Sequence, residues 1–243
     1  MNDSIHDPFA LNDLPSLLSA NAYPGRGLVL GRTDAGRQAV VYFIMGRSQN
    51  SRNRLFKRAG SSVTITRFKE DASGDPSLIL YTPIRVLGGT TIVTNGDQTD
   101  TIYEAMTGGV SFEKALRMRT FEPDAPHYTP RISGITSACG YTLALFKAGD
   151  AAGSVCHRQF FCYEPRPGVA HFIHTYAHDG SPLPSFRGEP ASVRIPDAID
   201  EFTLSIWNAL DADNRVALYV RFIEPDGQYV DRLINRHEGD TLT

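Results

Sequence analysis

The feature that most constrains this chain is a succession of short apolar, β-branched segments separated by turn signals. About ten such segments occur, from "GLVLGRTDAGRQAVVYFIM" near the start to "QYVDRLINRH" near the end. The first predicts a hairpin, because two apolar runs flank the polar turn Asp34-Ala35-Gly36. So many strands without strict strand–helix alternation favour antiparallel sheets over a doubly wound parallel sheet.

Helical spacing occurs in fewer segments. The pair "TDTIYEAMTGG" and "VSFEKALRMRTF" follows a strand that ends at Asn95-Gly96, and Asp97 or Thr99 is a candidate cap for the first helix. Residues 195–210 place Ile199, Phe202 and Ile206 on one face. We therefore expect an α+β protein in which helices cover stacked antiparallel sheets. Pro83 interrupts the strand-like segment 77–87, which predicts an edge strand or a bend there.

Length and composition suit an ordinary globular protein. The chain has 243 residues, 41% hydrophobic and 21% charged, which we divide into an N-terminal extension with a short helix (1–22) and one domain (23–243). No run approaches the ~18 apolar residues that a membrane span needs. The acidic N-terminus lacks the basic and apolar regions of a secretory signal, and the three cysteines form no CxxC pair. These observations favour a cytoplasmic protein.

Positive charge is concentrated near the N-terminus. Residues 26–58 contain eight Lys or Arg and one acid, so that this segment carries +7 and the remainder −10 of the net −3. A nucleic-acid binder is usually basic over a whole face, and a pI of 6.2 argues against that class. The stretch "GRSQNSRNR" (46–54) is either a solvated basic loop or part of a local site for a small anion.

Several generic motifs do not hold up. The glycines of "GRGLVLG" have the spacing GxGxxxG and lead into a strand, so they do not form a dinucleotide fingerprint. Of the three histidines His171, His174 and His178, only His174 and His178 would share a face of a strand, which leaves the ligand set incomplete, so we expect no metal site. The regions of Cys139 and Cys156 could supply a thiol nucleophile, but inert cysteine in strands is the commoner case. No cofactor is expected.

Three polar stretches at the ends of apolar strands form the strongest candidate site. They are "YPGRG" with "GRSQNSRNR", then "TNGDQTDTIYE", then "FEPDAPHYTPRISG". These stretches, with "ILYTPIRV" and "FIHTYAHDG", resemble the archaeal-type IMP cyclohydrolase family from about Tyr23 to about Pro190. The most specific pieces are "NGDQTDTI" and "TPRI". The chain departs from the family pattern in its N-terminal extension, in two extra residues within "RSQNSRNR" and in a longer C-terminal part.

The resemblance implies both a fold and a reaction. The implied fold is the N-terminal-nucleophile-hydrolase-like αββα four-layer sandwich, in which helices flank two antiparallel sheets, without covalent catalysis. The implied reaction closes the purine ring of 5-formamidoimidazole-4-carboxamide ribonucleotide, as the carboxamide nitrogen attacks the formyl carbon and water is lost to give IMP. The implied partner is thus a small-molecule purine ribonucleotide.

Site residues follow from the resemblance position by position. It implies Tyr81 as a hydrogen-bond donor or proton shuttle, Glu122 as the base, and Arg54 as a contact to the phosphate or the developing oxyanion. The implied substrate-binding residues are Arg26, Arg47, Ser48, Asn53, Asn95, Thr99, Asp100, Thr129 and Arg131.

Each of these residues also has a structural alternative. Tyr81 could be a packed core residue, Glu122 could terminate a helix, and Arg131 could pair with a neighbouring carboxylate. Arg52 and Arg58 are expected at the surface. Two other functions stay open, namely a related amidohydrolase and a non-catalytic purine-nucleotide-binding protein on the same fold. The aromatic segment "RQFFCYEP" is a candidate subunit contact, which leaves a homo-oligomer open.

Overall fold

The strands form two antiparallel sheets in the computed structural model, which describes residues 10–69 and 80–243. The first sheet has the order β11-β10-β1-β2-β12-β13 and the second the order β3-β4-β5-β6-β7-β8-β9. The first contains β1 (Arg26–Arg32), β2 (Gln38–Met45), β10 (Val169–His174), β11 (Ala191–Arg194), β12 (Arg215–Ile223) and β13 (Tyr229–Asn235). The second contains β3 (Arg54–Ala59), β4 (Ser62–Arg67), β5 (Ile84–Leu87), β6 (Thr90–Thr94), β7 (Arg131–Ser137), β8 (Gly140–Ala148) and β9 (Cys156–Tyr163).

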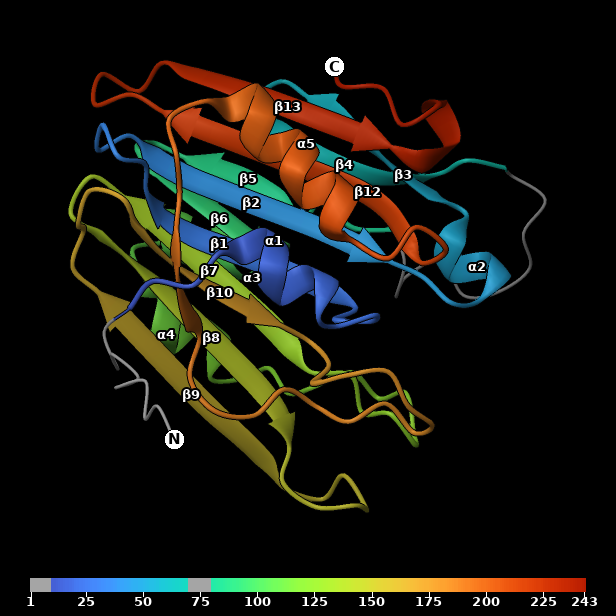
Figure 1. Cartoon of the computed structure of the whole chain (residues 1–243). Coiled ribbons are helices and arrows are strands. Elements are labelled where there is room, and N and C mark those ends of the chain that lie inside the picture. Colours follow the sequence, from blue (N-terminus) through green and yellow to red (C-terminus); the bar gives the residue numbers. More distant parts are fainter. Residues whose placement is uncertain (1–9, 70–79) are drawn as a thin grey trace, which may run out of the picture.

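Helices cover the outer face of each sheet (Figure 1). On the first sheet lie α1 (Leu14–Ser19) and α5 (Ile199–Ala209), whose buried side chains join the outer core of that sheet. On the second lie α3 (Gln98–Thr107) and α4 (Phe112–Leu116), which pack on β6 and β8 through Ile102, Phe112 and Leu116. A short helix, α2 (Gln49–Arg52), links β2 to β3, and a 3-10 turn, Arg236–Glu238, follows β13. The described elements therefore stack as helices, sheet, sheet, helices.

The strands at the centre of the first sheet are apolar on both faces because both faces are covered. In β2, Val40, Tyr42 and Ile44 face the second sheet, whereas Val41 and Phe43 face the helices. Each fully buried side chain of this size contributes about 1.5–3 kcal/mol through the hydrophobic effect. The same alternation in β1 directs Leu28 and Leu30 into the space between the sheets. Arg26 lies two residues before Leu28 and therefore points to the same face of the sheet.

The α+β class with stacked antiparallel sheets is confirmed, as are the helix in the N-terminal extension and the Asp34-Ala35-Gly36 hairpin. Of the two alternatives at Pro83, an edge strand or a bend, the edge strand is wrong, because β5 begins at Ile84 and lies between β4 and β6. Residues 77–79 of that predicted segment lie outside the described residues. No helix in the described part of the chain is long and apolar enough to cross a membrane.

Two helix-related expectations also need correction. Asp97 is the N-cap residue of α3, but its side chain makes no capping hydrogen bond, because its carboxylate pairs with Arg131 and Arg119. The basic stretch 46–54 contains the helix α2, so it is not a loop throughout, as the first of its two interpretations has it. A reciprocal capping box between Ser48 and Ser51 begins this helix.

Candidate active site

Five strand ends meet at one end of the sandwich, on the side of α2 in Figure 1. Strand β1 begins at Arg26, which pairs with Ile44 near the end of β2, and its neighbour Gly27 pairs with His174 at the end of β10. In the second sheet, Arg54 begins β3 and pairs with Arg67 at the end of β4. Residues that are far apart in sequence are thereby brought to one place.

Arg26 extends from β1 into the space between the sheets. Its buried Nε has no hydrogen-bond partner, and among the described residues no ion pair engages its side chain. Burial alone would lower the pKa of Arg26, but Glu122, Tyr176 and Tyr81 outweigh that effect and raise it well above its usual value. Arg26 is thus a permanent cation with unused donor capacity.

Arg54 is the second buried cation, with 0% of its surface exposed. Its Nε donates to the Ser51 carbonyl (2.8 Å) and its Nη2 to the Met45 carbonyl (3.0 Å), whereas the buried Nη1 has no partner. Burial and then the nearby charge of Arg26 lower the pKa of Arg54. Two guanidinium groups that repel each other, each with a spare N–H, are suited to share an anion.

Two tyrosines lie beside these cations. The hydroxyls of Tyr42 and Tyr81 are 2.8 Å apart, and both side chains are buried. Burial, followed by the neighbouring Tyr81, raises the pKa of Tyr42 well above its usual value, so Tyr42 stays protonated. Tyr42 can then donate to Tyr81, which leaves the Tyr81 hydroxyl proton available for a ligand.

Glu122 supplies the carboxylate of the cluster. It lies in the segment between α4 and β7, where its backbone N–H donates to the Thr129 carbonyl (2.9 Å), and only 4% of the residue is exposed. Burial raises the pKa of Glu122, and the opposing charges of Arg26 and Arg131 offset this only in part. Within the described residues Glu122 has no ion-pair partner. A carboxyl group whose pKa is raised in this way is a stronger base than an exposed one, so it can both accept and return a proton.

A further polar group adjoins Arg26 from the β10 side. The Tyr176 hydroxyl is 2.7 Å from the Thr129 hydroxyl, which in turn donates to the Asp124 carboxylate. The Tyr176 ring stacks on Tyr23 with centroids 5.8 Å apart. The Arg47 guanidinium carbon lies 5.0 Å from the centroid of the Tyr23 ring, on the rim of the cluster.

The structure therefore brings Arg26, Arg54, Tyr81, Glu122 and Thr129 into one cluster and leaves Arg47 at its rim. Arg47 pairs with Asp179 (2.6 Å) and donates to the Gly180 carbonyl (2.9 Å). Ser48 caps α2, and the amide of Asn53 bonds the backbone of Lys69. Ser48 and Asn53 thus make contacts that hold local structure around α2.

The residues of "NGDQTD" and "TPRI" that were expected in the site lie mostly beside it. Asn95 accepts from the Ile132 N–H (2.9 Å) and donates to the Pro130 carbonyl (2.8 Å). Thr99 bonds Thr94 (2.6 Å). Arg131 pairs with Asp97 (2.7 Å) on the α3 side of the second sheet and reaches Glu122 through its charge. Asp100 pairs with Arg85 (2.8 Å) and is not brought to the cluster.

Several members of the cluster were not predicted from the sequence, namely Tyr23, Tyr42, Arg67, Asp124 and Tyr176. Arg67 pairs directly with Arg54 across β3 and β4, and directly paired residues share a face of the sheet. Asp124 and Tyr176 belong to the stretches "FEPD" and "FIHTYAHDG", which resemble the family. These stretches indicated the region of the site, although the two residues themselves were not predicted. Tyr42 was hidden inside an apolar strand.

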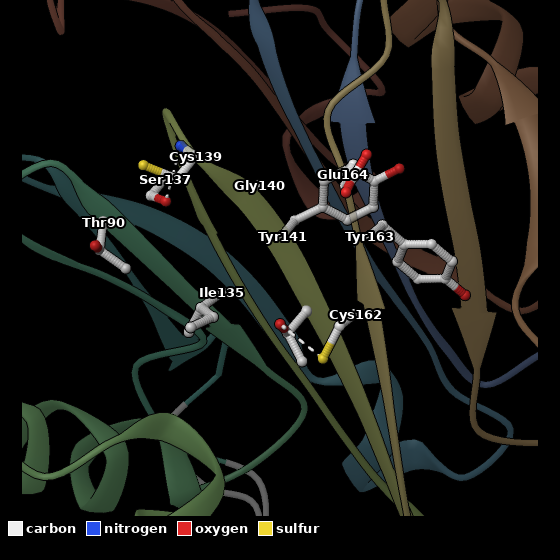
Figure 2. A pocket seen from close by; sticks show the side chains of 10 residues that line it. Thr90, Ile135, Ser137, Cys139, Gly140, Tyr141, Cys162, Tyr163 and Glu164 are labelled. Carbon is white, nitrogen blue, oxygen red and sulfur yellow. Dashed lines mark hydrogen bonds between the residues drawn. The ribbon is translucent and has the colours of Figure 1, made fainter.

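A separate cavity lies at the other end of the second sheet (Figure 2). It has a volume of about 470 Å³ and is lined by the β7–β8 turn and the end of β9, including Ser137, Cys139, Tyr141 and Tyr163. Because Arg131 begins β7 and Ser137 ends it, the length of that strand separates this cavity from the cluster. No group of three or more His, Cys, Asp or Glu suited to a metal occurs among the described residues.

A two-sheet α+β sandwich with a buried cluster of arginine, tyrosine and glutamate defines a candidate small-molecule enzyme. The profile of the family described as IMP cyclohydrolase-like protein matches residues 23–228. The chain belongs to this family. It is 34% identical over 157 residues to the IMP cyclohydrolase of Methanopyrus kandleri, an alignment that covers 63% of this chain and 75% of that protein.

Two further relatives are also IMP cyclohydrolases. The IMP cyclohydrolase of Methanococcus aeolicus is 31% identical over 127 residues, which cover 49% of this chain and 62% of that protein. The IMP cyclohydrolase of Methanocella arvoryzae is 30% identical over 142 residues, which cover 53% of this chain and 69% of that protein. The chain thus spans between about three fifths and three quarters of these three relatives.

Proposed function

We propose that this protein is an IMP cyclohydrolase that closes the purine ring of 5-formamidoimidazole-4-carboxamide ribonucleotide with loss of water. One observation carries the proposal: Arg26, Arg54, Tyr81 and Glu122 meet at one end of the sandwich, where two guanidinium groups keep N–H donors without partners. Membership of the family supports the choice of substrate.

The first requirement of the reaction is to hold an anionic ribonucleotide. Guanidinium groups bind phosphoryl oxygens through charge-assisted hydrogen bonds, each contributing about 1.5–3 kcal/mol. Arg26 and Arg54 offer such bonds from inside the cluster, and Arg47 offers them from the rim, where it must first exchange its contact with Asp179. Thr129 belongs to the wall, and Asn95, Thr99 and Arg131 support that wall by fixing the β6–α3 turn and the start of β7.

The second requirement is acid–base chemistry at the two reacting groups. An amide nitrogen is a weak nucleophile, so Glu122 accepts its proton while the nitrogen attacks the formyl carbon. The formyl oxygen becomes an alkoxide, which Tyr81 and Arg54 stabilise by donating hydrogen bonds. Glu122 then returns this proton to the alkoxide, which becomes a hydroxyl group. The former formamide nitrogen gives up its own proton to the departing hydroxyl group as the C=N bond forms, so that water leaves and the ring becomes aromatic. Both reacting groups belong to one molecule, and holding them in line accounts for part of the rate enhancement.

The same proposal includes a non-covalent mechanism on an N-terminal-nucleophile-hydrolase-like αββα framework. The succession of helices, sheet, sheet and helices supports the framework. The composition of the cluster supports the mechanism, since its arginine, tyrosine and glutamate side chains can act by binding and proton transfer alone. Intact-protein mass spectrometry during turnover tests this point, because a covalent intermediate would add the mass of the substrate.

The test of the activity is direct. Purified protein is mixed with the formylated ribonucleotide, and IMP is followed by its absorbance and by chromatography. The proposal expects IMP to accumulate. It is rejected if no IMP forms and neither the formylated nor the unformylated ribonucleotide binds. Binding without turnover would favour a nucleotide-binding protein, and turnover of another nucleotide-like amide alone would favour a related amidohydrolase.

A further inference from the structure

The hydrogen-bond chain that ends at Tyr176 has a fixed direction. Asp124 accepts from the backbone N–H of Thr129 (2.6 Å) and also from the Thr129 hydroxyl. A carboxylate has no proton to give, so the Thr129 hydroxyl is the donor in its contact with Asp124. The Thr129 oxygen is then an acceptor, and the hydroxyl 2.7 Å away, that of Tyr176, is the one that donates to it.

Tyr176 therefore presents oxygen lone pairs, and not a proton, to the rest of the cluster. Its single hydroxyl proton is directed to Thr129. Burial raises the pKa of Tyr176 although Arg26 opposes the shift, so the hydroxyl stays protonated at neutral pH. Stacking on Tyr23 holds the ring in place, and Tyr176 and Thr129 are 3% and 1% exposed, so water offers little competition for these bonds. Arg26 is close enough for its charge to lower the pKa of Tyr176, and Tyr176 in turn raises the pKa of Arg26.

On the Tyr81 side of the cluster the roles are reversed, and the hydroxyl that faces a ligand is a hydrogen-bond donor. Tyr42 is fully buried, and its hydroxyl has Tyr81 as its hydrogen-bond partner among the described residues. A Tyr42 proton directed to Tyr81 leaves Tyr81 as a donor towards a ligand. The cluster thus has an acceptor hydroxyl on one side and a donor hydroxyl on the other. A substrate with an N–H group next to a carbonyl group matches this pair.

We propose that Tyr176 is a specificity-determining residue that accepts a hydrogen bond from the carboxamide N–H of the substrate, and that Asp124 and Thr129 act as positioning residues that keep its hydroxyl turned away. The inference rests on the proposed function, since it assigns a role in binding that same ribonucleotide. It explains how the site distinguishes a carboxamide, which has N–H donors, from a carboxylate, which has only acceptors. A site built to receive a donor discriminates strongly against a ligand that lacks one.

The test measures a ratio of affinities by titration calorimetry. The probes are 5-aminoimidazole-4-carboxamide ribonucleotide and its 4-carboxylate counterpart, which differ in the group that meets Tyr176. The parent protein should prefer the carboxamide at least tenfold. Thr129→Val removes the hydroxyl without changing the shape much, frees the Tyr176 proton and should reduce the preference at least fivefold. Thr129→Ser keeps the hydroxyl and should keep the preference. Tyr176→Phe removes the acceptor and should also reduce it.

Two outcomes overturn the inference, and they are distinguishable. If ring closure proceeds in the parent but Thr129→Val, folded as judged by its thermal transition, keeps the full preference for the carboxamide, the role of the chain in specificity is wrong and the proposed activity stands. If the parent binds neither ribonucleotide and forms no IMP, the inference falls together with the proposed function. A ratio that changes in Thr129→Val and not in Thr129→Ser supports it, because loss of packing alone would weaken both ligands alike.

Discussion

Arg26 and Glu122 are oppositely charged neighbours in a buried cluster, yet no ion pair joins them. The electrostatic effect of each on the pKa of the other places them close together, whereas the 11 ion pairs between described residues include neither side chain. A buried cation and a buried carboxylate at such separation are costly unless something polar fits between them. We interpret the gap as the place of the substrate.

This arrangement predicts how stability depends on pH. The pKa of Glu122 is raised above the usual value of 4.5, so the folded protein holds a proton there that the unfolded chain loses. Below pH 4.5 the contribution of Glu122 to the free energy of unfolding does not change with pH. As the pH rises from the unfolded-state pKa to the folded-state pKa, this contribution is lost and stability falls. Glu122→Gln removes the titration. Urea unfolding from pH 4 to 8 should show the parent losing stability relative to the variant, and parallel curves would contradict the prediction.

The same carboxyl group should control the pH dependence of catalysis. As a base, Glu122 must be ionised in the free enzyme, so kcat/KM is expected to rise with pH through its raised pKa and then level off. In Glu122→Gln we expect kcat to fall by at least about 100-fold, with the acidic limb of the profile lost. If Glu122→Gln retained the acidic limb of the kcat/KM profile, another titrating group would be responsible for that limb and the prediction would be wrong.

The Tyr81 hydroxyl should act on the transition state more than on binding. Tyr81→Phe is expected to lower kcat about 10- to 1000-fold, as the loss of one donor to a developing oxyanion does, while the Kd for IMP changes little. Tyr42→Phe removes only the partner of Tyr81 and should have a smaller effect on kcat. Steady-state kinetics with the formylated ribonucleotide and calorimetry with IMP separate these effects. Equal losses in kcat and in IMP affinity for Tyr81→Phe would argue for a role in binding alone.

Asp100 provides a control from the outer face of the second sheet. It pairs with Arg85, and the side chains are 49% and 28% exposed, so the pair contributes at most about 1 kcal/mol to stability. Asp100→Asn should therefore leave kcat and KM unchanged within twofold and alter the free energy of unfolding only slightly. A large loss of activity in this variant would show that the "NGDQTD" stretch reaches the substrate after all.

The sequence predicted the layers of this fold better than the membership of its site. Periodicity identifies strands such as β2 and β12 because burial on both faces makes them apolar throughout. It did not identify β7, because Arg131 and Gly134 interrupt its apolar pattern. The edge-strand alternative at Pro83 was wrong because a proline just before a strand leaves the pairing of an interior strand intact.

Within the site, the residue types were predictable and their partners were not. Arg26, Arg54, Tyr81 and Glu122 come from four separate segments. The two arginines lie in different sheets, and they come together because the sheets stack and because β2 leads through α2 into β3, where Arg54 donates to the Met45 carbonyl. Ser48 and Asn53 look like ligand donors in sequence, but they hold α2 and the end of β4. Tyr42 lies in a strand with core residues on either side, so nothing in its local sequence distinguishes it from a packed tyrosine.

A crystal structure of the protein with IMP bound tests the proposed site most directly. We expect the nucleotide at the end of the sandwich where β1 and β3 begin, with its phosphoryl oxygens bonded to arginines of the cluster and its pyrimidine ring beside Tyr81 and Glu122. IMP bound in the cavity lined by Ser137, Cys139 and Tyr163, with the arginine cluster empty, would contradict it.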